Sequence, residues 1–140
     1  MYEIGVGVPL DAVEAVKWFR LSADQGYPKA QNNLGMAYDT GTGVPHDAVE
    51  AATWFRLAAN QGEALAQVNL GKMYATGEGV PKDIVLAHMW FTVSSTGGNQ
   101  DADGLRDLAE TLMTPAQIAD ATQRAKACMN SDYADCGYGD

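Results

Sequence analysis

The sequence is poor in basic residues, and this shortage limits the partners that the protein can have. Nine lysines and arginines stand against 18 aspartates and glutamates, which gives a formal net charge of −9 at pH 7. A protein that binds a phosphate backbone needs a basic surface to displace the bound counterions. An anionic membrane surface also attracts basic segments. We therefore expect neither nucleic acid nor a membrane as a partner.

The sequence also lacks a continuous apolar run of about 18 residues, so it predicts no membrane-spanning helix. No basic segment followed by an apolar segment opens the chain, and no signal peptide is visible. The opening segment Tyr2–Asp11 instead matches residues 38–47 and 74–83. We expect from this match that the chain begins inside a repeat unit, downstream of any export signal.

Few residues have the chemistry of a catalytic or metal site. The only histidines, His46 and His88, lie far apart in the sequence and have no ligand partner at a typical spacing, so we predict no metal ion and no cofactor. The Gly-x-Gly-Val-Pro segments lack the third glycine and the preceding strand of a dinucleotide-binding loop. None of four serines begins the Ser-x-x-Lys motif of serine β-lactam enzymes, namely Ser22, Ser94, Ser95 and Ser131. We predict no catalytic residue and no enzyme activity.

The informative feature of the sequence is a repeat of 36 residues. Trp18, Trp54 and Trp90 share this spacing, and segments 2–37 and 38–73 have 22 identical residues out of 36. A period of about 20–50 residues indicates a solenoid, in which each unit buries its apolar face against its neighbours. We predict one domain over residues 1–140. Its repeat units are expected at about 2–37, 38–73 and 74–109, followed by a cap at 110–130 and a tail at 131–140.

Each period predicts an antiparallel pair of helices. In residues 47–60 apolar residues recur at spacings of three and four, with Asp47 at the expected N-cap. Similar patterns predict helices at 11–24, 28–39 and 64–75. Gly35 and Gly71 fall inside helices, which suggests that a neighbouring helix approaches closely there.

Two further helices are predicted near the C-terminus, at about 101–113 and 115–129. Thr114, Pro115 and Gln117 form the start of the second. The first is expected to turn Leu105, Leu108, Ala109 and Leu112 inward, and the second Ile118, Ala121, Ala125 and Met129. The pattern predicts an all-α array of helix pairs with a C-terminal capping helix.

These residues resemble a known family, the Sel1-like repeat (SLR) family of tetratricopeptide-like (TPR-like) repeat proteins. The resemblance covers about residues 2–98 and rests on Ala30-Gln31, Asn33-Leu34-Gly35, Tyr38, Gly41, Gly43-Val44, Asp47, Ala51, Trp54-Phe55, Ala59 and Gly62. Residues 113–118, with Ala125 and Cys128, are similar to the closing segment of many bacterial members. The resemblance implies a right-handed α-solenoid that mediates protein–protein contacts, and no enzyme activity in general.

Cys128 and Cys136 are the only cysteines, eight residues apart. A turn between them would allow a disulfide, whose Cα atoms are about 4.4–6.8 Å apart, but two free thiols remain the alternative. Cysteine-rich family members share this C-x7-C spacing. A disulfide would indicate an oxidising compartment, so a periplasmic or secreted location is expected, with a cytoplasmic location as the alternative.

The function expected from these features is a non-catalytic interaction scaffold that presents a concave surface to a peptide or protein. The candidate binding residues lie on the inner helices and are Asn32, Asn33, Met36, Thr40, Asn69, Lys72 and Thr76. The recurring asparagines either bind a partner or bond to an adjacent helix. The alternative function, implied by the cysteine-rich members, is a protein that binds penicillin or weakly hydrolyses β-lactams.

The first predicted helix lacks a preceding partner helix in this chain. An exposed apolar edge of a solenoid tends to find another surface. We therefore expect self-association, or a bound apolar segment, at Ile4, Val6, Val13 and Val16.

Overall fold

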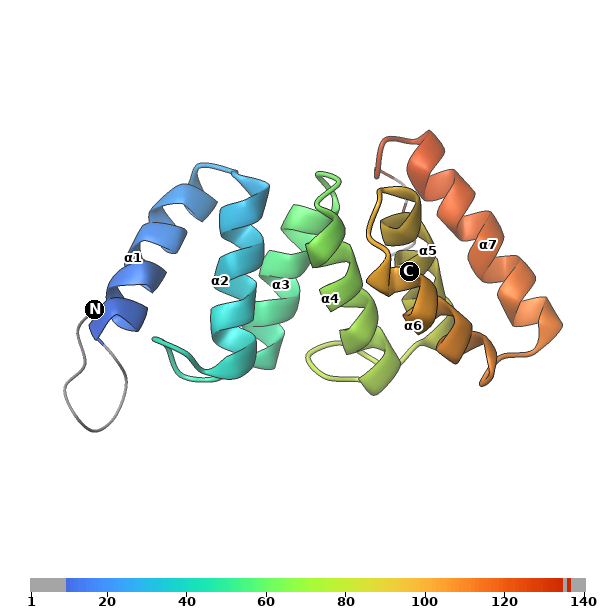
Figure 1. The fold of residues 1–140 in the computed structure, drawn as a ribbon, viewed down its shortest axis with the longest axis horizontal. Coiled ribbons are helices and arrows are strands. Elements are labelled where there is room, and N and C mark those ends of the chain that lie inside the picture. Colours follow the sequence, from blue (N-terminus) through green and yellow to red (C-terminus); the bar gives the residue numbers. More distant parts are fainter. Residues whose placement is uncertain (1–9, 135, 137–140) are drawn as a thin grey trace.

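The computed structural model describes residues 10–134 and 136, and all regular structure in this part of the chain is helical. Its seven helices are shown in Figure 1. Their bounds are α1 Leu10–Asp24, α2 Pro28–Thr40, α3 Ala48–Ala59, α4 Ala64–Thr76, α5 Ile84–Thr96, α6 Asp101–Glu110 and α7 Pro115–Asn130. The predicted all-α solenoid is confirmed. The predicted helix at 101–113 ends three residues early, at Glu110.

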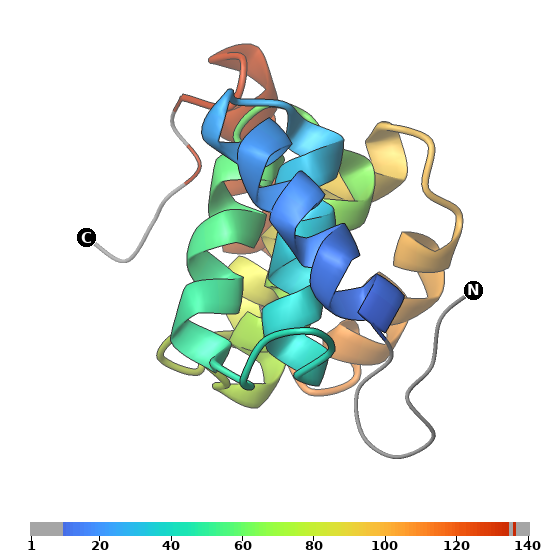
Figure 2. The ribbon, with the colours of Figure 1, turned by 90° about the vertical axis from the view of Figure 1, so that its left-hand side faces the viewer.

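The helices form a linear stack in which each helix from α1 to α5 contacts the next along the chain, and both α6 and α7 pack on α5. In Figure 1, α2, α4 and α6 lie in front, with α3 and α5 behind them. The view from the α1 end in Figure 2 shows the same two rows of helices. We call the first row the α2–α4–α6 face. It corresponds to the inner helices expected from the sequence.

Polar side chains define where the helices begin. The Asp47 carboxylate accepts a hydrogen bond from the backbone N–H of Glu50 at 3.1 Å, and Asp83 does the same for Leu86. Thr114 and Gln117 form the complete capping box predicted at the start of α7. Each cap satisfies a backbone donor that has no partner within its helix. The sequence signals for these helix starts are confirmed.

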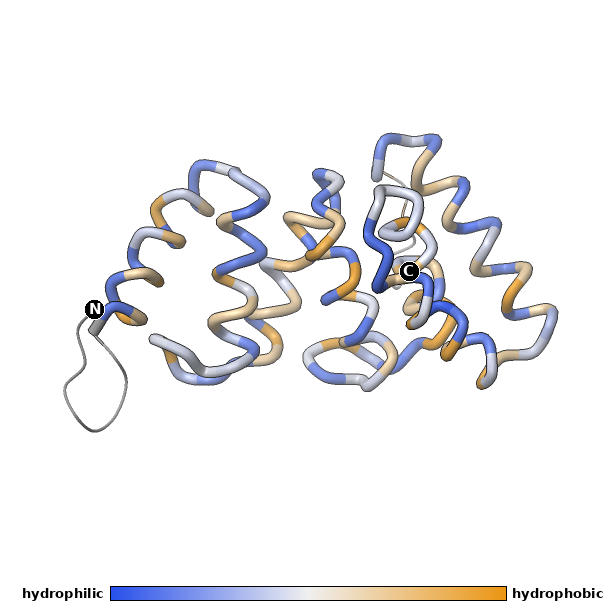
Figure 3. Tube along the Cα trace, viewed as in Figure 1, coloured by the Kyte–Doolittle hydropathy of each residue, from blue (hydrophilic) through white to orange (hydrophobic). Residues whose placement is uncertain are grey.

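Apolar residues at equivalent positions of the repeat form the core, but they are buried to different extents along the stack. In Figure 3 apolar and polar positions alternate along the helices, so that each helix has an apolar side to bury. The three equivalent tryptophans differ in burial: Trp18 is 64% exposed, Trp54 is half-buried, and Trp90 is 0% exposed. Trp90 lies on α5, which α4, α6 and α7 contact, whereas α1 contacts α2. Position in the stack therefore decides how much of the apolar stripe is covered.

Gly35 and Gly71 mark close contacts between paired helices, as predicted. A Cβ atom at Gly71 would lie 2.6 Å from Cε1 of Phe91 and 3.3 Å from the carbonyl oxygen of Ala87 on α5. Gly35 has the same relation to Phe55 on α3. The absence of a side chain at these positions lets the aromatic ring of the partner helix lie against the backbone.

We expect Gly71→Ala to lower the free energy of unfolding by about 1–3 kcal/mol, because the added methyl group displaces the Phe91 ring. Gly104→Ala is the matched control. Gly104 also lies within a helix, but a Cβ atom there would have no neighbour within 4 Å. Alanine should stabilise that helix by about 0.5–1 kcal/mol. Urea denaturation of both variants checks the prediction, and a stabilising Gly71→Ala would contradict it.

The C-terminal segment is tied to the helical stack by a disulfide between Cys128 and Cys136, whose Cα atoms are 4.3 Å apart. Both cysteines are buried in the main core. The turn between them contains Asp132 and Tyr133 with φ angles of 57° and 68°, and the Tyr133 N–H donates to the Cys128 carbonyl oxygen at 2.8 Å. Tyr133 lies against Gly62 at the turn after α3. The disulfide left open by the sequence is therefore present.

Candidate functional site

An apolar groove of about 470 Å³ lies between α4 and α6. Its floor and walls come from α4, α5 and α6, and Asp39 at the end of α2 contributes to its rim. The apolar lining consists of Met73, Ala75, Ile84, Phe91, Leu105, Leu108, Ala109 and Leu112. Ligand pockets in proteins usually have volumes of about 300–1,000 Å³ and a mainly apolar lining. The groove therefore has the size and character of a binding site for apolar side chains.

The groove is open at Leu108 on α6 and at Leu112 in the turn after α6, two leucines that the sequence pattern placed inward. Leu108 is 63% exposed and Leu112 is 72% exposed, so this prediction is wrong. The capping helix α7 packs on α5, as α6 does, and Leu108 and Leu112 border the groove instead of a packed neighbour. Ala102 and Ala109 make the buried contacts of α6 instead. Ile118 on α7 was also expected inward and is only half-buried.

Three of the predicted binding residues line this groove. Asn69, Lys72 and Thr76 lie along α4 and give the groove a polar edge. Lys72 and Thr76 are exposed, and Asn69 is half-buried. The structure therefore brings three of the seven predicted residues together beside apolar residues that were not in the predicted set. The sequence pattern had placed Leu108 and Leu112 in the core, so neither was counted among the candidate binding residues.

Three other predicted residues line a separate, smaller hollow. Asn33, Met36 and Thr40 lie on α2 and face α1 across a volume of about 270 Å³. The remaining lining residues are Ala12, Ala15, Val16, Phe19, Ala37 and Thr42. The predicted binding residues therefore divide between two hollows and do not form one continuous site.

Asn32 does not lie on an exposed face as expected. It is buried, and its Oδ1 atom accepts a hydrogen bond of 3.0 Å from Nδ2 of Asn69. Neighbouring glutamines behave similarly: Gln31 donates to the carbonyl oxygen of Ala23, and Gln67 donates to that of Ala59. A buried amide needs such partners because its desolvation is costly. Asn32 therefore joins α2 to α4 within the stack.

The predicted self-association edge is also altered by the structure. Val16 is buried, in contact with α2 and with the turn at Gly43, so it is not an exposed edge residue. Val13 is half-buried. Ile4 and Val6 lie outside the described residues. The exposed apolar side chains of α1 are Trp18 and Leu21, and self-association through this helix remains a prediction.

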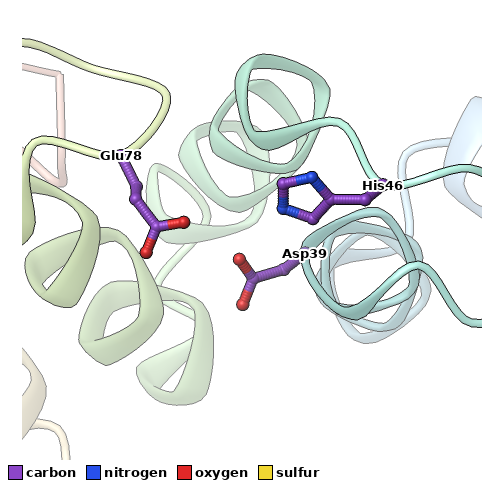
Figure 4. Close-up of side chains that lie close together, drawn as sticks. All are labelled: Asp39, His46 and Glu78. Atoms are coloured by element: carbon purple, nitrogen blue, oxygen red, sulfur yellow. The ribbon is translucent and has the colours of Figure 1, made fainter.

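The structure brings together three polar side chains that the sequence analysis missed: Asp39, His46 and Glu78 (Figure 4). One ligand atom of each lies within 4.8 Å of the others, and all three residues are exposed. The prediction of no metal site rested on the large separation of the two histidines in the sequence. Because consecutive loops of a solenoid stack on each other, a histidine can instead meet carboxylates from the next unit.

His88, the other histidine, has a different environment. It is buried on α5, and its Nε2 atom lies 2.8 Å from Oε2 of Glu110 on α6. Its Nδ1 atom lies 3.5 Å from the Thr92 hydroxyl. These contacts connect two packed helices, which gives His88 a structural role. Ser94 is similarly buried and donates to the carbonyl oxygen of Ala64 at 2.7 Å, so its hydroxyl is not available as a surface nucleophile.

None of the helices in the described part of the chain combines the length and the apolar character that a membrane span requires.

Comparisons with known proteins agree with the geometry. The chain is 38% identical to a solved structure described as c5321, a protective antigen of uropathogenic Escherichia coli strains with an SLR fold, with a TM-score of 0.83. It is 36% identical to a Sel1 repeat protein from Oxalobacter formigenes, with a TM-score of 0.66. These alignments cover 87% and 69% of this chain but 27% and 40% of those chains, so this chain spans less than half of either relative. No curated protein matches the sequence significantly.

The family model described as Sel1 repeat matches residues 1–27, 28–63 and 64–99. These three segments include the helix pairs α2–α3 and α4–α5 together with α1. They cover more than half of the chain, and the resemblance read from the repeat motif is confirmed. The chain belongs to the Sel1 repeat family.

Proposed function

We propose that this protein is a non-catalytic interaction scaffold that binds a segment of another protein in the groove between α4 and α6. The Sel1 repeat fold generally mediates protein–protein interaction. The observation that supports a specific site is the pair Leu108 and Leu112, both exposed beside a hollow of about 470 Å³. Exposed apolar side chains gathered at a concave surface favour a partner that covers them.

The shape and charge of the groove indicate the kind of segment that fits. Its apolar floor suits leucine, phenylalanine or methionine side chains, and Asn69 and Thr76 supply groups that hydrogen-bond to a peptide backbone. Asp39 and Glu78 at the rim, with a net charge of −9 on the chain, favour a partner that carries basic residues next to its apolar anchor. The proposed ligand is therefore an amphipathic peptide segment with a positive charge.

The location that we propose is outside the cytoplasm, in the periplasm or the extracellular medium. The supporting observation is the disulfide between Cys128 and Cys136. Disulfides persist in oxidising compartments and are rare in the cytosol. No observation favours the β-lactam alternative, and it is not part of the proposal.

We expect Leu108→Glu to weaken binding of a groove peptide by about tenfold or more, corresponding to ~1.4 kcal/mol. A carboxylate at this position would have to be desolvated against the apolar partner side chain. Peptides selected by display against the full chain supply the ligand, and fluorescence anisotropy measures the dissociation constant for each variant.

Val49→Glu is the matched control for the groove variant. Val49 is 65% exposed, close to the 63% of Leu108, and lies on α3 away from the groove lining. This variant should keep the affinity of the wild type. Equal binding by Leu108→Glu and the wild type, or equal losses in the two variants, would show that the groove is not the site.

A further inference from the structure

We propose that Asp39, His46 and Glu78 form a binding site for one divalent transition-metal ion, with Zn²⁺ as the representative. The site joins the end of α2 to two consecutive repeat loops, and it shares Asp39 and Glu78 with the rim of the proposed peptide groove. It would use one imidazole nitrogen and two carboxylate groups, which is a donor set found in protein sites for zinc and related ions.

The backbone explains why these three side chains meet. Asp39 lies in the last turn of α2, and His46 follows in the loop that leads to α3. Glu78 comes from the equivalent loop of the next unit. That loop reaches α3 through Gly79, where a Cβ atom would lie 2.3 Å from the carbonyl oxygen of Ala48. This close approach, at a φ of +73°, places Glu78 beside the residues that precede α3.

The distances are close to those of a metal site. Ligand atoms about 2.1 Å from a tetrahedral ion are about 3.4 Å from each other. The three atoms here all lie within 4.8 Å of one another, so each pair has to close by about 1.4 Å at most. All three side chains are exposed, and rotation about their side-chain bonds supplies a movement of this size. Figure 4 shows the three side chains close together, with Asp39 on the last turn of α2 and His46 and Glu78 on the two loops.

The electrostatic environment favours a cation. The C-terminal end of a helix carries about half a negative charge. Asp39 adds a carboxylate to the end of α2, and Glu78 adds one directly after the α4 C-cap at Gly77. Neither helix has a basic residue in its last turn. Within residues 10–134, no ion pair joins Asp39 or Glu78 to a lysine or arginine. A bound divalent ion would neutralise this concentration of negative charge.

The set is particular to this place in the repeat. Shifting each residue by one period of 36 gives Ala75 for Asp39, Lys82 for His46 and Thr42 for Glu78. The equivalent loop one unit later therefore places a lysine where this loop has an imidazole. The cluster is thus not a by-product of the repeat motif. The same comparison supplies substitutions that the fold already accepts at equivalent positions.

Isothermal titration of the full chain with ZnCl₂ tests the proposal. The wild type should bind one Zn²⁺, and His46→Lys, Asp39→Ala and Glu78→Thr should each weaken binding by about tenfold or more, since changes even in the residues that support metal ligands cost 10–100-fold. Mg²⁺ and Ca²⁺ should bind more weakly than Zn²⁺, because both prefer oxygen ligands alone. Asp24→Asn, at an exposed carboxylate on α1, should leave the affinity unchanged.

Nuclear magnetic resonance of the imidazole groups gives an independent measurement. The chain has two histidines, so the two sets of ring signals are readily assigned with one variant. Zn²⁺ should shift the His46 signals and leave those of buried His88 in place. Absence of binding at millimolar Zn²⁺ would overturn the proposal. So would affinity that survives all three substitutions, or Ca²⁺ affinity that equals that of Zn²⁺ and does not depend on His46.

Discussion

Trp90→Ala is expected to lower the free energy of unfolding by about 3–5 kcal/mol, the usual cost of removing a buried tryptophan. Trp90 is 0% exposed on the helix that α4, α6 and α7 all contact. Alanine would leave a cavity that the surrounding helices cannot fill, because they are held by their own packing and by the disulfide. Urea denaturation followed by circular dichroism measures the loss.

Trp18→Ala provides the internal control, since Trp18 occupies the same repeat position 72 residues earlier. Because Trp18 is 64% exposed, Trp18→Ala should lower the free energy of unfolding by about 0.5 kcal/mol or less. The same chemical change is therefore expected to have very different effects at two equivalent positions. If both variants lost a similar free energy of unfolding, the difference in burial between Trp90 and Trp18 would be contradicted.

Reduction of the disulfide between Cys128 and Cys136 should lower the free energy of unfolding by about 2.5 kcal/mol. This value follows from the loop entropy that a link across eight residues removes from the unfolded chain. The comparison is urea denaturation with and without a reducing agent. After reduction, Tyr133 should lose its contact with the turn at Gly62. The two sulfur atoms should lose their contacts in the core.

Two controls separate the disulfide from other effects of the reducing agent. Cys136→Ser should match the reduced wild type and should not respond to the reducing agent. Alkylation of the folded protein without reduction should label neither cysteine in mass spectrometry. Quantitative labelling of both, or an unfolding free energy that is the same in both conditions, would show that the bond does not stabilise the protein.

The parts of the fold that could be predicted were those set by local or periodic signals. Asp47 and Thr114 begin helices because their side chains satisfy nearby backbone donors, which a sequence shows directly. Gly71 recurs with the period, and its role in helix contact follows from that recurrence. The repeat length itself determined the fold class, because stacking is the way such units bury their apolar sides.

The features that could not be predicted depend on which neighbour covers a residue. Leu108 has the spacing of a core residue, but its exposure follows from α7 packing on α5 and leaving this side of α6 uncovered. Asn32 is a polar residue of a type usually found at the surface. It is buried here, and its amide oxygen accepts a hydrogen bond from Asn69 in the next unit. Asp39, His46 and Glu78 meet only after two loops stack. Projecting each loop onto the next at the repeat distance would have found this cluster.

The linear order of helix contacts has a mechanical consequence. From α1 to α5 each helix packs on the next in the chain, and α7 packs on α5, so a pulling force applied at α1 and α7 passes through these interfaces in series. Elements in series extend one after another, starting with the weakest, so the end helix α1 should detach before the α4–α5 core yields. The disulfide shortens the length that the C-terminal segment can release. When pulled from its two ends, the molecule should therefore lengthen in steps, one helix interface at a time.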